Sequence, residues 1–290
     1  MHCFNQGAIV ETAPAAPAQC ATAPASLRAQ ALAALQLADP DAKCAAALAL
    51  HALAATLAPD PGEQLACAAA LPGHPPRPQL TDHLSVPRRS PATREGRAAL
   101  IHSIAHIEFN AINLALDAAW RFAGMPEAFY RDWLRVAADE ARHFLLLRDH
   151  LRAQLASDYG DFAAHQGLWS MCEKTAHDIT ARMALVPRTL EARGLDATPL
   201  IQRKLRQVGT PDALAAVAIL DTIVREEIDH VAIGNHWYQW LCARQGLDAA
   251  AHYAALVQRY QAPRPRPPLN EAARRAAGFS DAEIAWLQQG

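Results

Sequence analysis

The sequence contains few β-branched aliphatic residues and no stretch in which apolar and polar positions alternate. A half-buried β-strand needs such alternation, so the sequence offers little material for a sheet. Alanine and leucine dominate instead, and both are strong helix formers. We therefore expect an all-α protein.

Excess charge, long apolar runs and paired cysteines are also missing. A formal net charge of −2 provides no global field that would attract nucleic acid or an anionic membrane. No segment resembles a signal peptide, and no apolar run reaches membrane-spanning length. The six cysteines form no C-x-x-C pair, which argues against a zinc or disulfide framework. Reduced thiols in a cytoplasmic protein are expected.

Proline-rich stretches divide the chain into four expected segments. They are a disordered or loosely attached lead (1–25), an N-terminal helical hairpin with a Pro-rich wrap (26–89), a four-helix bundle (90–261) and a C-terminal wrapping tail (262–290). The hairpin comprises helices near 27–37 and 42–57, and Asp39-Pro40-Asp41 suits the start of the second. Ser280 and Glu283 have the spacing of a capping box.

Within the bundle, Gly-x-Pro turns at 124–126 and 209–211 separate the helices into two pairs. Helices are expected near 90–123, 126–155 and 168–193, and from the second turn to Arg244. Residues 156–165 form a long crossover between the second and third helices. Pro187 is expected to bend the third helix, and Gly194–Pro199 to interrupt it before Leu200–Val208 resumes the pattern.

Two E-x-x-H pairs, Glu140/His143 and Glu227/His230, are the principal motifs. A step of three residues in an α-helix turns by about 300°, so both side chains of a pair share one face. That face is otherwise apolar in both segments. An ionised carboxylate is not stable in an apolar core without compensation, and a bound metal would provide it. The alternative for either pair alone is a solvated helix face or an intrahelical hydrogen bond.

The spacing around the two turns strengthens the metal interpretation. Glu108 lies sixteen residues before Gly124 and Glu140 sixteen after it; Glu191 lies eighteen before Gly209 and Glu227 eighteen after it. Antiparallel helices folded back at these turns would bring each pair of carboxylates to one level. The pattern therefore repeats, and it predicts six ligands on four helices. They are Glu108, Glu140, His143, Glu191, Glu227 and His230.

Four carboxylates and two imidazoles suit a dinuclear site for hard or borderline ions, with open positions for oxygen or substrate. For the third helix, Glu173 is an alternative to Glu191, because it lies five turns earlier on the same face. His102 and His106 point away from Glu108, so a surface or second-layer position is expected for them.

Four further residues are expected near the metals, each with an ordinary structural alternative. His177 and Arg188 share the face of Glu191 and could orient ligands, hold an anionic substrate group, or form a simple buried pair. Gly234 follows His230 on the inner face and would leave room for substrate. Tyr238 could be a redox tyrosine or a core residue.

These motifs resemble the ferritin-like di-iron carboxylate superfamily, whose ligand order is Glu, E-x-x-H, Glu, E-x-x-H. The likeness covers about residues 92–242 and maps onto the six residues above. The stretches EGRAALIHSIAHIE, DEARHF, ARMALVPRTLEARGLDATP and REEIDHVAIG are similar to a bacterial ferritin-like family known only as a domain of unknown function. The tail PPLNEAARRAAGFS extends that similarity. The LEAR stretch around Glu191 also resembles tRNA-modifying di-iron hydroxylases.

The resemblance implies a ferritin-like bundle with two iron ions, or manganese and iron, that activates oxygen as a hydroxylase or oxidase. Expected partners are oxygen, a small-molecule substrate and an electron donor, without a membrane; nucleic acid is not expected but stays open, as does homo-oligomerisation. Alternatives are a ferroxidase or iron-handling protein, a tRNA-modifying hydroxylase, and a helical interaction module with a vestigial site. The segments added to the bundle favour an oxidoreductase, because storage proteins are typically bare bundles.

Overall fold

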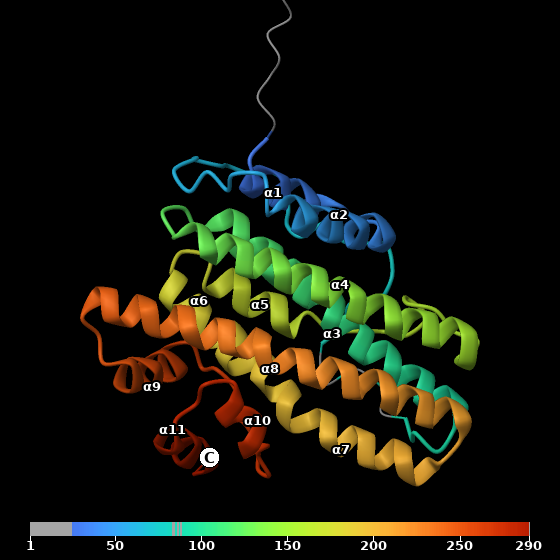
Figure 1. Cartoon of the computed structure of the whole chain (residues 1–290). Coiled ribbons are helices and arrows are strands. Elements are labelled where there is room, and N and C mark those ends of the chain that lie inside the picture. Colours follow the sequence, from blue (N-terminus) through green and yellow to red (C-terminus); the bar gives the residue numbers. More distant parts are fainter. Residues whose placement is uncertain (1–24, 83–84, 86, 88, 290) are drawn as a thin grey trace, which may run out of the picture.

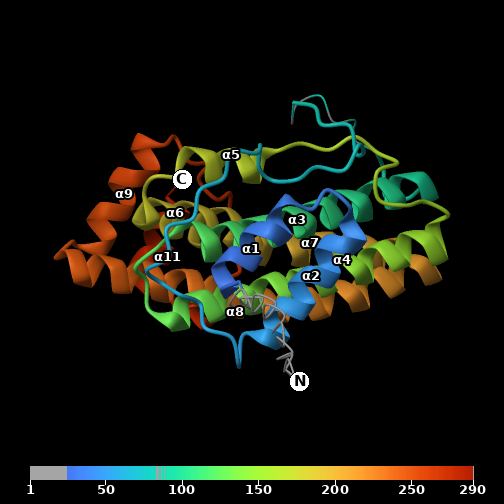
Figure 2. The same cartoon turned by 90° about the horizontal axis from the view of Figure 1, so that it is seen from above.

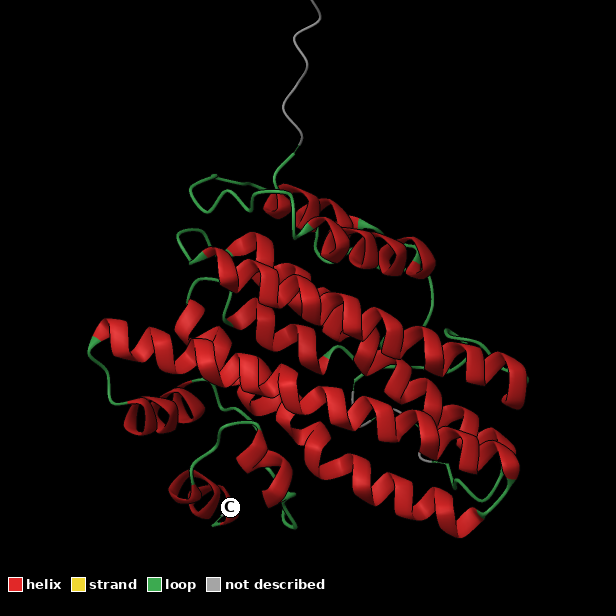
Figure 3. Ribbon diagram, viewed as in Figure 1, coloured by secondary structure: helices red, strands yellow, loops and turns green. Residues whose placement is uncertain are grey.

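The computed structural model describes residues 25–82, 85, 87 and 89–289. Helices account for nearly all regular structure in these residues, and Figure 3 shows helices joined by loops with no strand. The single β-bridge in this part of the chain joins Leu80 to Ala164. The predicted all-α class is confirmed.

The first bundle pair consists of α3 (Arg94–Arg121) and α4 (Glu127–Leu155). Thr93 caps α3 by accepting a hydrogen bond from the amide of Gly96. The chain then reverses at Gly124, whose φ of 77° lies in the left-handed region that glycine adopts without strain. Both helices match the predicted ranges closely.

We call each long helical component of the bundle a rod; α3 and α4 are the first two. The third rod consists of four helical segments, whereas a helix near 168–193 followed by an interruption was predicted. They are α5 (Gly167–Lys174), α6 (Ile179–Leu185), the π-helical turn η1 (Val186–Glu191) and α7 (Ala192–Val208). The expected interruption at Gly194–Pro199 is wrong, since α7 runs through it. Pro199 cannot donate to the carbonyl of Leu195. The side-chain amide of Asn270 donates to that carbonyl instead, at 3.2 Å, so the helix continues.

The π-helical turn falls where a bend was predicted from Pro187. Pro187 has no N–H for the helical ladder, and the hydroxyl of Thr189 donates to the carbonyl of Ala184 at 2.8 Å. This side-chain bond spans five residues, the spacing of a π-helix. Such a turn inserts one extra residue into the helix, and Glu191 is its last residue.

The fourth rod is α8 (Pro211–Gln245), which begins after the left-handed Gly209 as predicted. It runs antiparallel to α7 and contacts α4, α6 and η1 (Figure 1). The four rods therefore enclose a common interior.

The N-terminal hairpin consists of α1 (Leu27–Gln36) and α2 (Pro40–Leu53), which lie across α3 and α4 (Figure 2). Asp39 caps α2, in agreement with the sequence. The predicted lead at 1–25 lies almost wholly outside the described residues. The Pro-rich stretch that follows α2 has no helix in its described part, and it contacts the crossover through the Leu80–Ala164 bridge.

The covered position of α3 explains its apolar character. Every residue from Glu108 to Trp120 is buried. Among the described residues, α3 is the one helix long and apolar enough to cross a membrane, but 78% of that apolar window is buried inside the protein. Core helices of bundles share these properties.

The chain ends in α9 (Ala249–Arg259), α10 (Glu271–Ala276) and α11 (Asp281–Gln288). The predicted capping box is confirmed, with Ser280 and Glu283 each bonding the other's backbone amide. Figure 1 shows these helices, in red, on the side of α8 opposite the N-terminal hairpin.

Candidate metal centre

Acidic and imidazole side chains from three rods meet in the bundle interior. Ligand atoms of Glu108 on α3, Glu140 and His143 on α4, and Glu227 on α8 all lie within 4.8 Å of one another. Glu140 and His143 have no exposed side-chain surface, and only 12% of the Glu227 side chain is exposed. This buried group could hold a metal ion.

The two imidazoles enter the cluster symmetrically. The Nδ1 atom of His143 lies 3.4 Å from Glu140 and 3.8 Å from Glu227. The Nδ1 atom of His230 lies 2.9 Å from Glu140 and 3.5 Å from Glu227. The ring centroids are 5.7 Å apart. Glu140 and Glu227 therefore lie between the two histidines.

The remaining two predicted carboxylates, Glu108 and Glu191, also lie near these side chains. Glu108 lies 3.3 Å from Nδ1 of His143. Glu191 ends η1 and interacts electrostatically with Glu227, Glu140 and His230. Glu191 therefore lies near the cluster, but neither Glu191 nor His230 is among the four residues whose ligand atoms all lie within 4.8 Å of one another.

Three side-chain atoms of these residues lack hydrogen-bond partners. They are Oε2 of Glu140, Nδ1 of His143 and Oε2 of Glu191, all buried. A buried polar atom without a partner is costly, and native proteins satisfy nearly all of them. A cation coordinated by these oxygen and nitrogen atoms would satisfy them, so the residues fit a bound metal.

Burial and mutual repulsion shift the carboxyl groups towards their neutral forms. Burial, together with the neighbouring Glu140, raises the pKa of Glu108 to about 8. Burial also raises the pKa of Glu191 well above its ordinary value, and Glu227 and Glu140 add to the effect. Without a cation these side chains retain protons at neutral pH.

The imidazoles shift in the opposite sense. Burial by itself would lower the pKa of His143, but the neighbouring carboxylates of Glu108 and Glu140 outweigh it and raise that pKa to about 11. For His230 burial is likewise outweighed, by Glu140 and Glu227, and the pKa rises well above its usual value. Protons thus provide the positive charge that this cluster of carboxylates requires.

Two acidic residues that the sequence analysis did not single out orient the histidines from outside. Nε2 of His143 lies 2.9 Å from Glu226 on α8, and Nε2 of His230 lies 3.3 Å from Asp139 on α4. Arg142 forms ion pairs with both acids. Burial would raise the pKa of Asp139, but its bond to His230 outweighs burial and lowers it.

The two contacts are reciprocal. Asp139, which precedes Glu140 on α4, contacts His230 of α8, and Glu226, which precedes Glu227 on α8, contacts His143 of α4. Metal-binding histidines commonly use their second ring nitrogen in this way, which fixes the tautomer and ring orientation. The sequence carried a signal for these residues. Each E-x-x-H is preceded by an acid, as Asp139-Glu140 and Glu226-Glu227.

Glu173, the alternative on the third rod, lies elsewhere. It is exposed on α5, and its carboxylate accepts a hydrogen bond from the indole of Trp169 at 3.2 Å. The structure thus places Glu191 beside the cluster and Glu173 on the surface. The chain also turns at Gly209, not at Gly194, as the choice of Glu191 requires.

Of the four further residues, His177, Arg188 and Tyr238 have hydrogen bonds to parts of the chain outside the cluster. His177 is exposed in the loop after α5, 3.4 Å from the hydroxyl of Tyr260. Tyr238 is buried and donates to the carbonyl of Ala249 at 2.7 Å, which is the core role left open for it. Arg188 is buried and contacts residues of α8 and the C-terminal tail.

The predicted open space at Gly234 is wrong. A Cβ at this position would lie 2.4 Å from Cβ of Pro187, so η1 already fills the space. Gly234 permits close contact between α8 and the π-helical turn. Sequence periodicity places Gly234 on the inner face but cannot show which neighbour occupies that face.

His102 and His106 are buried rather than on the surface. His102 accepts a hydrogen bond from the amide of Gly160 at 2.9 Å, and Nδ1 of His106 lies 2.8 Å from the hydroxyl of Tyr159. Both therefore anchor the crossover that follows α4.

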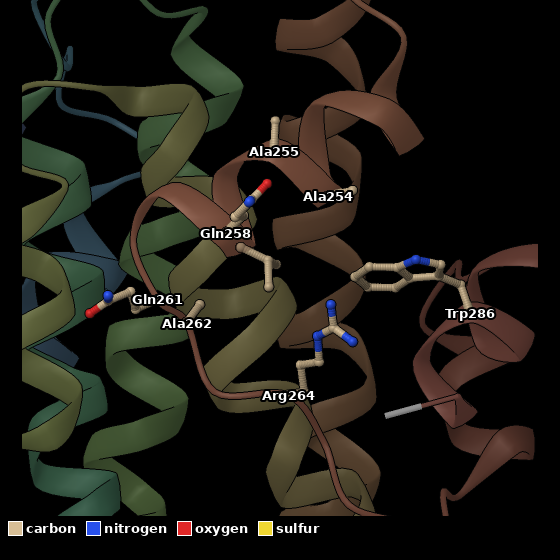
Figure 4. A pocket seen from close by; sticks show the side chains of 8 residues that line it. Ala254, Ala255, Gln258, Gln261, Ala262, Arg264 and Trp286 are labelled. Carbon is tan, nitrogen blue, oxygen red and sulfur yellow. The ribbon is translucent and has the colours of Figure 1, made fainter.

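A groove of about 630 Å³ lies away from the cluster, between α9, the following linker and α11 (Figure 4). It is lined by small and apolar side chains together with Gln258, Gln261, Arg264 and Trp286. No residue of the metal cluster lines it.

Fold and cluster together define an all-helical protein with a candidate metal centre in its interior. A family model described as "Protein of unknown function (DUF455)" matches residues 36–285, and the chain belongs to this family. An uncharacterised protein of Haemophilus influenzae is 52% identical over 222 residues, covering 74% of this chain and 76% of that protein. No solved structure matches the chain.

Proposed function

We propose that the cluster binds two iron ions, and that the protein is an oxygen-activating oxidoreductase of the hydroxylase or oxidase type with a ferritin-like bundle. The observation that carries the proposal is the position of Glu140 and Glu227 between two inward-facing imidazole Nδ1 atoms. One divalent ion beside each imidazole would share these two carboxylates. Glu108 would complete the His143 side and Glu191 the His230 side.

Charge supports two ions rather than one. Four ionised carboxylates carry four negative charges, which two divalent cations would neutralise without the protons that the cluster otherwise needs. Oxygen and imidazole nitrogen ligands without thiolate suit iron or manganese. The ligand order along the chain is that of the ferritin-like carboxylate proteins, which favours iron.

Two bound iron ions would supply electrons to dioxygen. The chain's own contribution would be to hold the ions at a fixed separation, to orient both imidazoles through Asp139 and Glu226, and to keep bulk water out of the interior. Glu108 and Glu191 hold protons in the metal-free state and would release them as the ions bind.

Anaerobic reconstitution with ferrous iron tests the proposal. We expect about two irons per chain in the wild type, and near-complete loss in Glu140→Ala and Glu227→Ala, since each removes a carboxylate shared by both ions. Oxygen exposure of the loaded protein should then change its optical spectrum. One tightly held zinc ion, or no iron after reconstitution, would overturn the proposal.

The same experiment separates the ferroxidase alternative. An iron-storing protein would assemble into a many-subunit cage and take up far more than two irons per chain. We expect uptake to stop near two, measured by iron analysis and by the mass of the assembly in solution.

A further inference from the structure

Arg188 lies in η1, three residues before Glu191, and its guanidinium is enclosed by distant parts of the chain. It donates to the side chain of Asn235 on α8 at 2.6 Å and forms an ion pair with Glu283 on α11. Only 1% of the Arg188 side chain is exposed. A buried cation needs such a partner, so Glu283 fixes where Arg188 can lie.

Aromatic rings complete the enclosure of Arg188. Its guanidinium carbon lies 4.5 Å from the ring centroid of Phe279, 4.8 Å from that of Tyr253 and 5.4 Å from that of Tyr238. Cation–π attraction of this kind is strongest where the cation is desolvated. Phe279, like Glu283, belongs to the C-terminal tail.

The tail also holds the chain immediately after Glu191. Arg274 on α10 forms a buried ion pair with Asp196 at 2.6 Å and donates to the carbonyl of Ala192 at 3.4 Å. Asn270 donates to Asp196 and to Leu195. The tail therefore binds the third rod on both sides of the residue that faces the cluster.

These tail contacts can stabilise the π-helical turn. Such a turn needs stabilisation, because π-helical turns are rare and less favourable than an α-helix. If the extra residue of η1 were absorbed into a regular helix, the residues that follow would rotate by about 100°. Glu191 would then leave the face that carries it toward Glu227 and His230. Pro187 and Thr189 favour the π-helical register from within the turn, and the contacts of Arg188 with α8 and the tail add to this from outside it.

We propose that the tail residues 270–283 are part of the metal centre's architecture, with Arg188 and Glu283 as positioning residues that aim Glu191 at the cluster. The inference rests on the proposed two-metal function. It assigns the tail a role at one half of the site, the His230 side, and none at the Glu108–His143 side.

Glu283→Gln is the sharpest variant. Glutamine can still serve the capping box, so the change removes mainly the negative charge opposite Arg188. Ser280→Ala is the matched control, because it disrupts the capping box and leaves the ion pair with Arg188 in place. Metal binding is measured by titrating each metal-free protein anaerobically with ferrous iron and counting bound ions.

We expect wild type and Ser280→Ala to bind two ions, and Glu283→Gln to hold one of them at least about tenfold more weakly, the usual effect of losing an outer positioning group. The double variant Glu191→Ala/Glu283→Gln should bind iron no worse than Glu191→Ala. A general loss of stability would instead weaken both ions and make the two changes additive.

The outcomes are distinguishable. Failure of the wild type to bind iron overturns the proposed function itself. Two ions held normally by both Glu283→Gln and the more severe Glu283→Ala would overturn only the role of the tail. If Glu283→Ala does not fold, amide hydrogen exchange at 189–192 in Glu283→Gln decides. Faster exchange there than in Ser280→Ala supports positioning, and equal exchange contradicts it.

Discussion

Gly234 and Pro187 are in such close contact that a Cβ on Gly234 would lie 2.4 Å from Cβ of Pro187. The contact joins α8, which carries Glu227 and His230, to η1, which ends at Glu191. Close packing at this point therefore helps set the separation between ligands on different rods. The space beside Gly234 that helical periodicity predicted for a substrate is filled by the side chain of Pro187 in η1.

Gly234→Ala is expected to destabilise the protein by about 1–3 kcal/mol, because the added methyl group forces η1 away from α8. Iron content should fall with stability, since the displaced turn carries Glu191. Thermal unfolding and metal analysis measure the two effects. The control is Gly194→Ala in α7, where a Cβ meets no atom within 4 Å. Replacing that helical glycine should stabilise the protein by about 0.5–1 kcal/mol. Equal behaviour of the two variants would contradict the packing argument.

Asp139→Asn and Glu226→Gln should each weaken iron binding by about 10–100-fold, because His230 or His143 loses the carboxylate that orients its ring. Equilibrium titration with ferrous iron measures the change. Asp149→Asn, at an exposed position on α4, serves as the control. Binding as tight as wild type in both variants would show that the outer acids do not orient the ligands.

Glu191→Ala should reduce iron from about two ions per chain towards one, since the ion on the His230 side loses a carboxylate of its own. Glu173→Ala should leave iron content unchanged and alter stability by no more than about 0.5 kcal/mol, as expected for an exposed residue. Metal analysis of the two purified variants distinguishes them. Loss of iron in Glu173→Ala alone would reverse the assignment.

Metal binding should release protons and become tighter as pH rises. The pKa of Glu108 is raised from 4.5 to about 8 and that of His143 from 6.5 to about 11, so the metal-free folded protein holds protons in these intervals that the unfolded chain does not. The stability of the metal-free protein should therefore fall as pH rises through 4.5–8 and 6.5–11.

Calorimetric iron titrations in buffers of different ionisation enthalpy measure the released protons directly. Apparent affinity should rise by about tenfold per pH unit for each proton displaced. A binding constant independent of pH between 6 and 8, with no proton release, would contradict this account of the cluster.

The local features of the fold were predictable because they depend on short-range chemistry. The left-handed glycines at 124 and 209, the cap at Asp39 and the box at Ser280 are all determined within a few residues of chain. Helical periodicity likewise places Glu108 and Glu140 on inner faces, and equal spacing from Gly124 brings them to one level. These inferences need only an antiparallel pair of helices.

The tertiary structure decided where helices contact one another. The π-helical turn depends on how Pro187 meets Gly234 and how Arg188 meets the tail, contacts between residues 47 or more positions apart in the chain. The reciprocal pairs Asp139–His230 and Glu226–His143 exist only because α4 and α8 lie side by side. Within a regular helix, sequence alone determined which side chains share a face, since that follows from 3.6 residues per turn. Which partners they meet depends on packing between rods, and no local pattern encodes it.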